Sequence, residues 1–256
     1  MKLQPLTPER FSHQRWVRYT NYKFAARDAV APVVVQELSK ALMHLPVCFI
    51  PRGDTFSLAV VQAIEPGKNL CVGPDGRWLA GYVPAAYRSH PFYVANTPGG
   101  SQVVCFDEDS GLLTQGEGEP FYDADGQLAQ DVRNAVAFLT EVTQNRIVTD
   151  QICTLLQQYQ LIQPWPIKIK QDADEQVING LYRVDEAAYN DLPLEAIETL
   201  RNAGALLVVY CQMLSMQNIQ RIAELAKVHV AAAESLRNSA MYPVDSGTID
   251  LSMLAD

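Results

Sequence analysis

The stretch Asn69–Phe92, NLCVGPDGRWLAGYVPAAYRSHPF, carries the densest set of structural signals in the chain. Two apolar arms, residues 70–72 and 78–83, flank Pro74-Asp75-Gly76, where proline presets φ and glycine permits the positive φ of a tight turn. These signals predict a β-hairpin. The loop that follows sets two prolines, two rings and two potential cations against its end, and we expect a site there: Pro84, Tyr87, Arg88, His90, Pro91 and Phe92.

Planar rings beside a guanidinium can stack a flat or sugar-like ligand while the arginine holds an anionic group. The first candidate binding site therefore comprises Trp78, Tyr82, Tyr87, Arg88, His90 and Phe92. A second cluster of the same kind, at the end of a later strand, comprises Tyr182, Arg183, Asp185 and Glu186. A structural role competes with binding and is the commoner outcome: Trp78 and Phe92 would fill the core, and Arg88 would pair with a carboxylate such as Asp185.

Composition predicts a folded globular protein. The chain has 256 residues, of which 48% are hydrophobic, enough for a sizeable core. We expect a single domain over 1–256, strand-rich over 1–126 and helix-rich over 127–256. Lys and Arg number 20 against 29 Asp and Glu, a net charge of -9, and no long basic run occurs. We therefore expect no nucleic-acid partner, because sequence-independent binding needs a basic face.

The sequence predicts a soluble protein, and the missing signal peptide and the free thiols predict a cytoplasmic location. The longest nearly uncharged apolar run, 203–213, is too short for a membrane span, which needs about 20 residues. Residues 1–6 lack the apolar core of a signal peptide. The five cysteines are odd in number, widely spaced and set mostly among apolar residues, which favours buried free thiols over disulfides.

The first half of the chain reads mainly as strands. A period of four at Val34, Leu38 and Leu42 predicts a helix from 31 to about 45. Strands are expected at 47–51 and 56–64, joined by a turn at Arg52-Gly53-Asp54, and at 102–106. The rings and basic residues within 1–30 suggest an aromatic ligand platform or, as we favour, an arm that packs onto the body: Phe11, His13, Trp16, Arg18, Tyr19, Tyr22, Lys23 and Phe24.

The second half reads mainly as helices. Residues 127–163 predict two antiparallel helices, with Asn145 or Thr149 as a cap between them. Further elements are a hairpin of strands 166–170 and 177–184, a helical turn capped by Asp185, a helix over 194–202 stopped by Gly204, a buried strand or helix over 205–213, a helix over 216–237, and a tail from 238. Strands 167–170 and 177–184 are too short for an independent sheet, so all strands can share one.

Together these elements predict an α+β fold, with a mixed or antiparallel sheet from the N-terminal and central hairpins packed against a predominantly helical C-terminal half.

No motif in the sequence predicts catalysis. Phosphate loops, paired zinc-ligand motifs and nucleophile elbows are missing, and the four histidines lie far apart without ligand spacing, so we expect no metal and no cofactor. Asp123-Ala124-Asp125-Gly126 resembles the start of a calcium loop, but the glycine comes too early and no closing Glu follows, which favours a solvated turn. Asp107 and Glu108 are expected to be solvated loop charges.

Several segments, weak singly but specific together, occur in a family's order over nearly all of residues 5–228: Asn69-Leu70, Asp75-Gly76-Arg77-Trp78, Tyr82-Val83-Pro84, Arg88, Pro91-Phe92, Gly118-Glu119-Pro120-Phe121, Gly180-Leu181-Tyr182-Arg183-Val184-Asp185-Glu186 and Leu214-Ser215-Met216-Gln217-Asn218. With them the chain resembles the bacterial SapC family. Two families carry this label. The resemblance is to the surface-layer-associated one, because the other, a peptide-transporter permease, needs membrane spans that this sequence lacks.

The resemblance implies a function without implying a site. It suggests a non-catalytic binding or accessory protein, with a protein or saccharide partner, linked to the surface layer or to nutrient uptake. The surface-layer name conflicts with the cytoplasmic location predicted above. Members also occur beside genes for flavin-dependent halogenase-like proteins, cupin-like proteins and TonB-dependent receptors, which leaves an enzyme or enzyme partner as the alternative. No catalytic residue is established for the family, so none is transferred.

Overall fold

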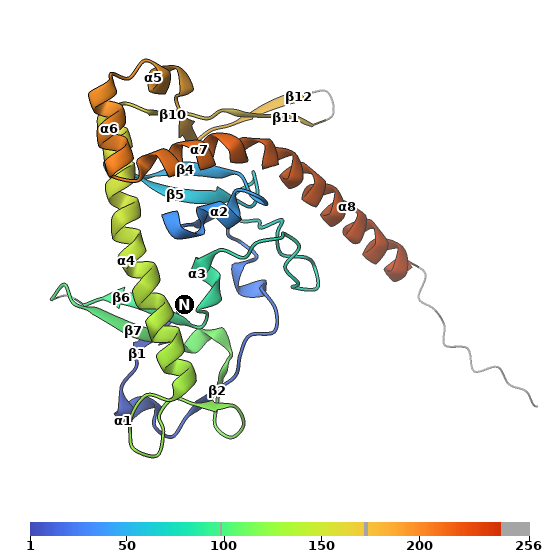
Figure 1. Cartoon of the computed structure of the whole chain (residues 1–256). Helices are drawn as coiled ribbons and strands as arrows, with labels where there is room; N and C mark the ends of the chain where they lie inside the picture. Colours follow the sequence, from blue (N-terminus) through green and yellow to red (C-terminus); the bar gives the residue numbers. More distant parts are fainter. Residues whose placement is uncertain (98, 172–173, 242–256) are drawn as a thin grey trace, which may run out of the picture.

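The largest sheet lies in the upper half of the molecule (Figure 1). The computed structural model describes residues 1–97, 99–171 and 174–241. The sheet has five strands in the order β10 (Ile162–Pro164), β13 (Tyr182–Val184), β4 (Val47–Arg52), β5 (Thr55–Val61) and β3 (Val30–Pro32), all antiparallel. The predicted hairpin of β4 and β5 is confirmed, with Gly53 in its turn at φ +59°.

The upper core, as we call the cluster around this sheet, is mainly aliphatic. Its fully buried members include Leu38, Leu58, Leu156, Leu161 and Leu200. α7 (Ala205–Ser215) covers the sheet and is tied to it by one buried amide: Gln212 Oε1 accepts from Val184 N at 2.9 Å, and Gln212 Nε2 donates to Val47 O at 3.1 Å. The apolar run 205–213 is therefore a core helix, one of the two forms that its sequence allowed.

The lower core is aromatic. It centres on Phe11, Trp16, Phe92, Phe106 and Phe121, whose ring centroids lie 4.8–6.3 Å apart in contacting pairs. Two small antiparallel sheets surround it, β1 (Leu3–Pro5), β7 (Gln102–Asp107) and β6 (Phe92–Asn96), and then β8 (Leu113–Thr114), β2 (Arg15–Trp16) and β9 (Glu119–Pro120). The short elements α1 (Pro8–Phe11), η1 (Lys23–Ala25) and η3 (Glu108–Ser110) complete the N-terminal half.

Asp107 and Glu108 fix the N-terminal segment to this lower sheet, so their predicted role as solvated loop charges is wrong. Asp107 is buried, and its Oδ1 accepts from Lys2 N at 2.8 Å. Glu108 pairs with Lys2 and Arg10, whose side chains lower its pKa. Carboxylates that follow a strand can thus hold a distant segment, and residue type alone does not reveal it.

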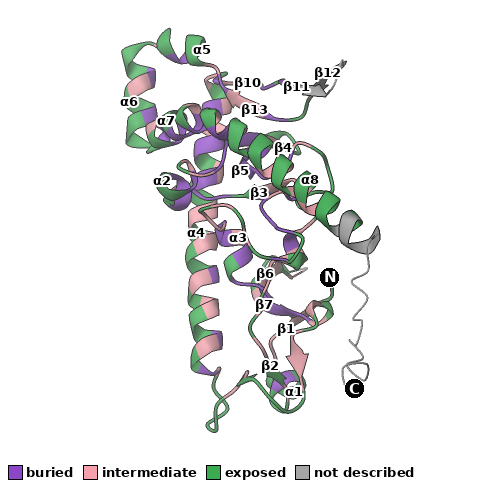
Figure 2. Ribbon diagram, turned by 90° about the vertical axis from the view of Figure 1, so that its right-hand side faces the viewer, coloured by how far each residue is buried: buried purple, intermediate pink, exposed green. Residues whose placement is uncertain are grey.

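One long helix, α4 (Gln130–Gln158), runs through both halves, and the prediction of two antiparallel helices is wrong (Figures 1 and 2). The two apolar faces read from the sequence contact different cores: Val132 and Leu139 pack in the lower core, and Ile152 and Leu156 in the upper. The expected cap Thr149 instead donates to Asn145 O at 2.7 Å inside the helix and accepts from Val35 N at 3.0 Å. Thr149 therefore connects α4 to Val35 and does not end the helix.

The stretch Asn69–Phe92 forms the predicted turn, but its two arms make little strand pairing. Gly76 has φ +88°, and Gly73 N donates to Arg77 O at 2.8 Å, as a tight turn requires. The predicted hairpin reduces to a single bridge, Val72↔Trp78, because Trp78 Nε1 donates to Tyr82 O and folds the second arm on itself. The helix predicted for 31–45 is likewise reduced to η2 (Val35–Glu37) and α2 (Leu38–Ala41), since 30–32 pair with β5.

The C-terminal half follows its predicted order closely. β11 (Ile167–Gln171) and β12 (Asp174–Ile178) form the expected hairpin, but Gly180 at φ +98° breaks the second strand. Its later part, β13, joins the main sheet between β10 and β4. Asp185 caps α5 (Glu186–Asn190), and α6 (Leu194–Asn202) ends before Gly204, as predicted. After η4 (Met216–Asn218), α8 (Ile219–Met241) continues to the end of the described chain; the predicted tail lies mostly in 242–256, outside the described residues.

Helices and antiparallel sheets with a helical C-terminal part confirm the α+β class. All five cysteines are buried and free, as expected from their apolar neighbours. In the described part of the chain, no helix is both long and apolar enough to cross a membrane.

Candidate functional site

A buried carboxylate organises the residues after the opening turn. Glu37 in η2 is only 5% exposed, and its two oxygens accept three hydrogen bonds. Glu37 Oε1 accepts from Val34 N at 2.8 Å, while Oε2 accepts from Ala85 N at 2.8 Å and from Tyr82 Oη at 2.7 Å. Burying a carboxylate is costly unless such donors surround it, so this set of bonds fixes the 82–85 segment against η2.

Arg88, at the end of α3 (Ala85–Arg88), is oriented by the same group. Its Nη2 donates to Tyr82 Oη at 2.7 Å and lies 3.6 Å from Glu37 Oε2. Its guanidinium carbon lies 5.5 Å from the Tyr82 ring centroid and 5.4 Å from that of Phe138 in α4. The Arg88 side chain remains 42% exposed, so an oriented cation reaches the surface. The predicted alternative partner Asp185 is wrong, because Asp185 caps α5.

His90 is stacked and uncharged, unlike the cation that the sequence suggested. Its ring lies parallel to Phe24 with centroids 3.8 Å apart, and its Nδ1 lies 3.0 Å from Tyr93 Oη. Burial lowers the His90 pKa to about 4, against a smaller opposing effect of Asp107. At neutral pH the ring therefore contributes a flat, neutral face.

The N-terminal rings pack onto this face, as the favoured arm interpretation predicted. Tyr19 contacts His90, Phe24 and Tyr22 with centroids 5.3–5.7 Å apart, and Tyr22 contacts Trp78 at 5.2 Å. Burial, with smaller effects of Tyr22, raises the Tyr19 pKa to about 12. Of residues 19–24, Tyr19 lines an open cleft beside Arg88 and His90.

An open cleft of about 630 Å³ lies where these groups meet α4. It is lined by Trp16, Arg18, Tyr19, Arg88, Ser89, His90, Phe92, Asp131, Asn134, Ala135 and Phe138. Of the six residues predicted first, Arg88, His90 and Phe92 line it, and Tyr82 supports Arg88 from behind. Trp78 and Tyr87 do not line the cleft, and their contacts are internal to the fold. Tyr87 Oη accepts from Gln62 Nε2 at 2.8 Å and donates to Asp28 Oδ2 at 3.0 Å.

A second guanidinium belongs to the cleft. Arg18 Nη2 pairs with Asp131 Oδ1 at 2.8 Å, and its guanidinium carbon lies 5.6 Å from the Trp16 ring centroid. Trp16 is 4% exposed, and its Nε1 has no hydrogen-bond partner among the described residues. Two arginines and several rings therefore share one opening in a chain of net charge -9.

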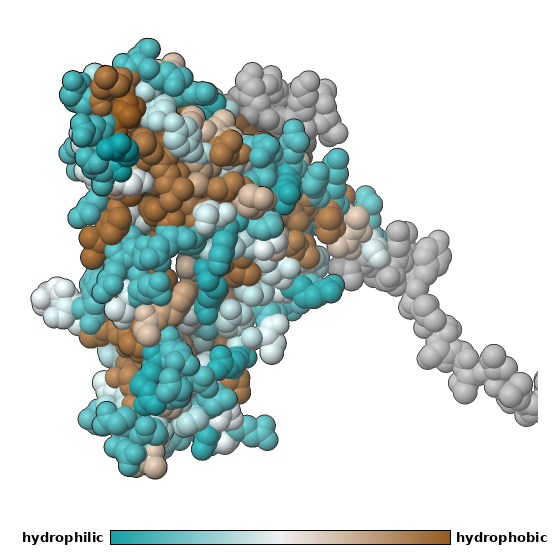
Figure 3. All heavy atoms as spheres, in the orientation of Figure 1, coloured by the Kyte–Doolittle hydropathy of each residue, from teal (hydrophilic) through white to brown (hydrophobic). Residues whose placement is uncertain are grey.

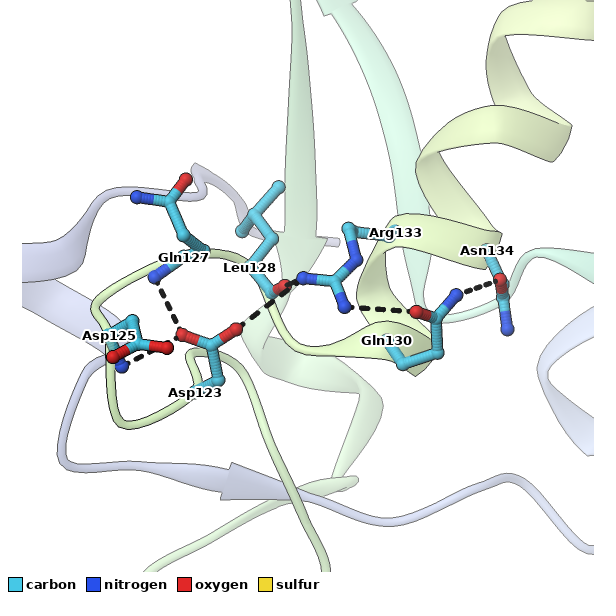
Figure 4. Close-up of polar contacts among 7 residues, drawn as sticks. All are labelled: Asp123, Asp125, Gln127, Leu128, Gln130, Arg133 and Asn134. Carbon is cyan, nitrogen blue, oxygen red and sulfur yellow. Dashed lines mark hydrogen bonds and ion pairs between the residues drawn. The ribbon is translucent and has the colours of Figure 1, made fainter.

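A polar network at the start of α4 includes one residue of the cleft, Asn134 (Figure 4). Asp123 Oδ1 accepts from Asp125 N at 3.1 Å and Gln127 N at 2.9 Å, and Asp123 Oδ2 lies 3.5 Å from Arg133 Nη1. The calcium-like segment is thus a turn whose main carboxylate is already engaged, as expected. Gln130 then donates to Asn134 Oδ1 at 2.8 Å, which links this turn to the cleft wall.

The second predicted cluster lies at a separate, smaller depression of about 500 Å³. Arg183, Asp185 and Glu186 line it with Gln163, Met213 and Met216 among others. Tyr182 instead packs on Phe56, with ring centroids 4.8 Å apart. Asp185 Oδ1 accepts from Ala188 N at 3.1 Å, so its carboxylate is engaged as a cap. This cluster offers fewer rings and one cation, and the cleft at Arg88 is the stronger candidate.

Sequence reasoning missed Glu37, Asp131, Asn134 and Phe138. Glu37 and Phe138 stand 51 and 50 positions away from Arg88 in the chain, and nothing in their local patterns marks them. Trp16, Arg18 and Tyr19 were noted for their rings and charges but assigned to packing. Among the described residues, no group of three or more His, Cys, Asp or Glu side chains is placed to hold a metal ion.

Comparison with family models matches residues 6–222 to the model described as SapC. This match covers both cores, the cleft and the first turn of α8. The searches of curated proteins and of solved structures found no match.

Proposed function

The chain belongs to the SapC family, and we propose that it acts as a non-catalytic binding or accessory protein whose ligand occupies the cleft at Arg88. The ligand class is an anionic ring compound, with an acidic saccharide as the favoured case. The observation that carries the proposal is Arg88 itself, held half-exposed over two rings by the buried Glu37 and the partly buried Tyr82.

The character of the cleft supports binding. The partly exposed rings of Tyr19 and Phe138 offer apolar faces, as sugar rings require, and Arg18 and Arg88 attract an anionic substituent. The titratable groups are engaged in internal contacts: His90 with Tyr93, and Asp131 with Arg18. A general acid or base has to be available to its substrate, so these contacts favour binding over proton transfer.

The cellular setting belongs to the same proposal. Five buried free thiols favour a reducing compartment, and we place the protein in the cytoplasm. The link to the surface layer or to nutrient uptake then lies in the partner or the ligand that the protein handles.

Calorimetry with glucuronate, glucose and benzoate tests the proposal. We expect glucuronate to bind, glucose to bind at least about tenfold more weakly because the carboxylate is lost, and Arg88→Gln to weaken glucuronate binding by a similar factor. Arg52→Gln is the matched control, an exposed arginine in β4 paired with Asp150 outside the cleft. Absence of binding by both acids, or equal binding by the Arg88→Gln variant, would contradict the proposal.

The same samples address the enzyme alternative. Product analysis by mass spectrometry after prolonged incubation should return glucuronate unchanged. Conversion that depends on Arg88 would replace the binding role with a catalytic one.

A further inference from the structure

α8 contacts the body along one face only. Ile222 is buried, Leu225 packs against the upper core, and His229 Nε2 lies 3.1 Å from Leu70 O. Beyond these contacts the helix projects from the molecule (Figure 1). A projecting helix of this kind gains little stability from propensity alone, since most helical stability in proteins comes from packing.

The opposite side, which we call the outer face of α8, is exposed throughout its described part. At helical spacing it presents Ala223, Glu224, Lys227, Val230, Ala231, Glu234 and Arg237. Val230 is 59% exposed, although it is a large apolar residue at the centre of this set. The hydropathy view shows brown atoms along α8 as well as over α6 and α7 (Figure 3).

The charges on this face are antisymmetric about Val230 and Ala231. Lys227 and Glu234 stand at equal distances before and after this centre and have opposite charges. Glu224 and Arg237 do the same farther out. If a second α8 lies antiparallel with Val230 facing its Ala231, then Lys227 faces Glu234 and Glu224 faces Arg237. A two-fold axis repeats each pair, which gives four opposite-charge pairs, and no two like charges stand directly opposite each other.

From this pattern we propose that two copies of the chain associate through the outer faces of α8, as an antiparallel two-fold dimer. A two-fold interface requires a self-complementary surface, and the order of charges on this face meets that requirement. The small side chains of Ala223 and Ala231 permit close approach of the helices. A net charge of -9 opposes association in general, so a face of mixed, matched charge is where two copies meet most readily.

The adjoining surface fits this arrangement. Glu224 lines an open groove of about 720 Å³ together with Arg221, Val228, Met43 and Leu79, among other residues. In the antiparallel pair, Arg237 of the second copy arrives beside Glu224 and hence beside this groove. Met43 and Val228, 59% and 49% exposed, are then available for contact with the arriving helix. The proposal is independent of the ligand cleft at Arg88.

Exposed ion pairs are individually weak, so the dimer is expected to be weak, on the order of micromolar, and sensitive to salt. Sedimentation velocity of the full chain over a range of concentrations should show monomer converting to dimer. Lys227→Glu sets like charges opposite Glu234 twice and should raise the dissociation constant at least about tenfold. Glu234→Lys should do the same, while the double variant K227E/E234K should restore association.

Circular dichroism and thermal unfolding confirm that each variant remains folded, and Arg201→Glu, an exposed change on α6, is the control that should dimerise like the parent. A parent that stays monomeric at every concentration overturns the proposal. Dimerisation unaffected by Lys227→Glu overturns it as well, as does failure of the double variant to recover.

Discussion

The two cores of this protein are built in different ways. The upper core packs aliphatic side chains on a five-stranded antiparallel sheet, where the β4–β5 register runs over six residue pairs. The lower core interlocks five large rings among strands of two to six residues. Hydrogen bonds between paired strands thus fix the arrangement of the upper half, and the packing of large side chains fixes that of the lower half. The cleft at Arg88 lies where the two meet, since Phe92 belongs to the lower core and Arg88 to the network of the upper half.

The largest expected effect separates the two kinds of core. Phe121→Ala removes a ring that contacts Phe11, Phe92 and Phe106, and should cost about 4 kcal/mol of unfolding free energy. Leu58→Ala in β5 should cost about 3 kcal/mol. Urea denaturation followed by circular dichroism measures both.

Because α4 is continuous through both cores, each variant should still unfold in one transition. Tryptophan fluorescence gives an independent probe, with Trp16 in the lower core and Trp165 near the sheet. Two separated transitions would mean that the halves are independent units, contrary to the single-domain prediction.

The upper half was also more predictable from the sequence than the lower half. Strands 47–51 and 56–64, the helix 194–202 and the Asp185 cap follow from local alternation and end signals, and the structure confirms them. The five rings of the lower core are single residues spread between positions 11 and 121, and their contacts leave no local period in the sequence. The sequence predicts two helices in place of α4 because the apolar face of this helix changes sides where it passes from one core to the other.

The cleft was predictable only on one side. Arg88, His90 and Phe92 were readable because they cluster in one segment with turn residues. Phe138 and Glu37, which fix and frame Arg88, lie in elements with ordinary amphipathic patterns. The neutral state of His90 depends on its burial, which lowers its pKa and which cannot be predicted from the residue type alone.

The junction of the halves should respond strongly to loss of its carboxylate. Glu37→Ala leaves two buried backbone N–H groups and the Tyr82 hydroxyl without their acceptor, and should cost about 3 kcal/mol. Glu65→Ala, a change at an exposed carboxylate, should stay within about 0.5 kcal/mol. A loss below about 1 kcal/mol on urea denaturation would show that the Glu37 network does not hold the junction.

Acid should weaken the junction through His90. Its pKa is near 6.5 when unfolded and about 4 in the folded protein, so the unfolded chain binds more protons in this interval. Stability should therefore fall as pH drops from about 6.5 towards 4, by about 2 kcal/mol at pH 5. His90→Phe should remove this slope, whereas His13→Phe, at an exposed site, should keep it. Parallel slopes for parent and His90→Phe would show that other groups control the acid response.

The smallest expected effect compares two exposed ion pairs along α4. Arg18 pairs with Asp131 in the lower half, and Arg52 pairs with Asp150 in the upper half; the two arginines are 65% and 66% exposed. Each arginine changed to Ala should cost about 0.5 kcal/mol, and Arg18 a few tenths more because it also lies over Trp16. High salt should reduce both losses, since exposed pairs are screened.

Their effects on ligand should diverge, because only Arg18 lines the cleft. Calorimetry should show weaker glucuronate binding for Arg18→Ala and none of this loss for Arg52→Ala. If Arg18→Ala instead costs more than about 2 kcal/mol of stability and leaves binding by the folded fraction intact, then Arg18 holds α4 to the N-terminal segment, and the cleft has one cation for its ligand, Arg88.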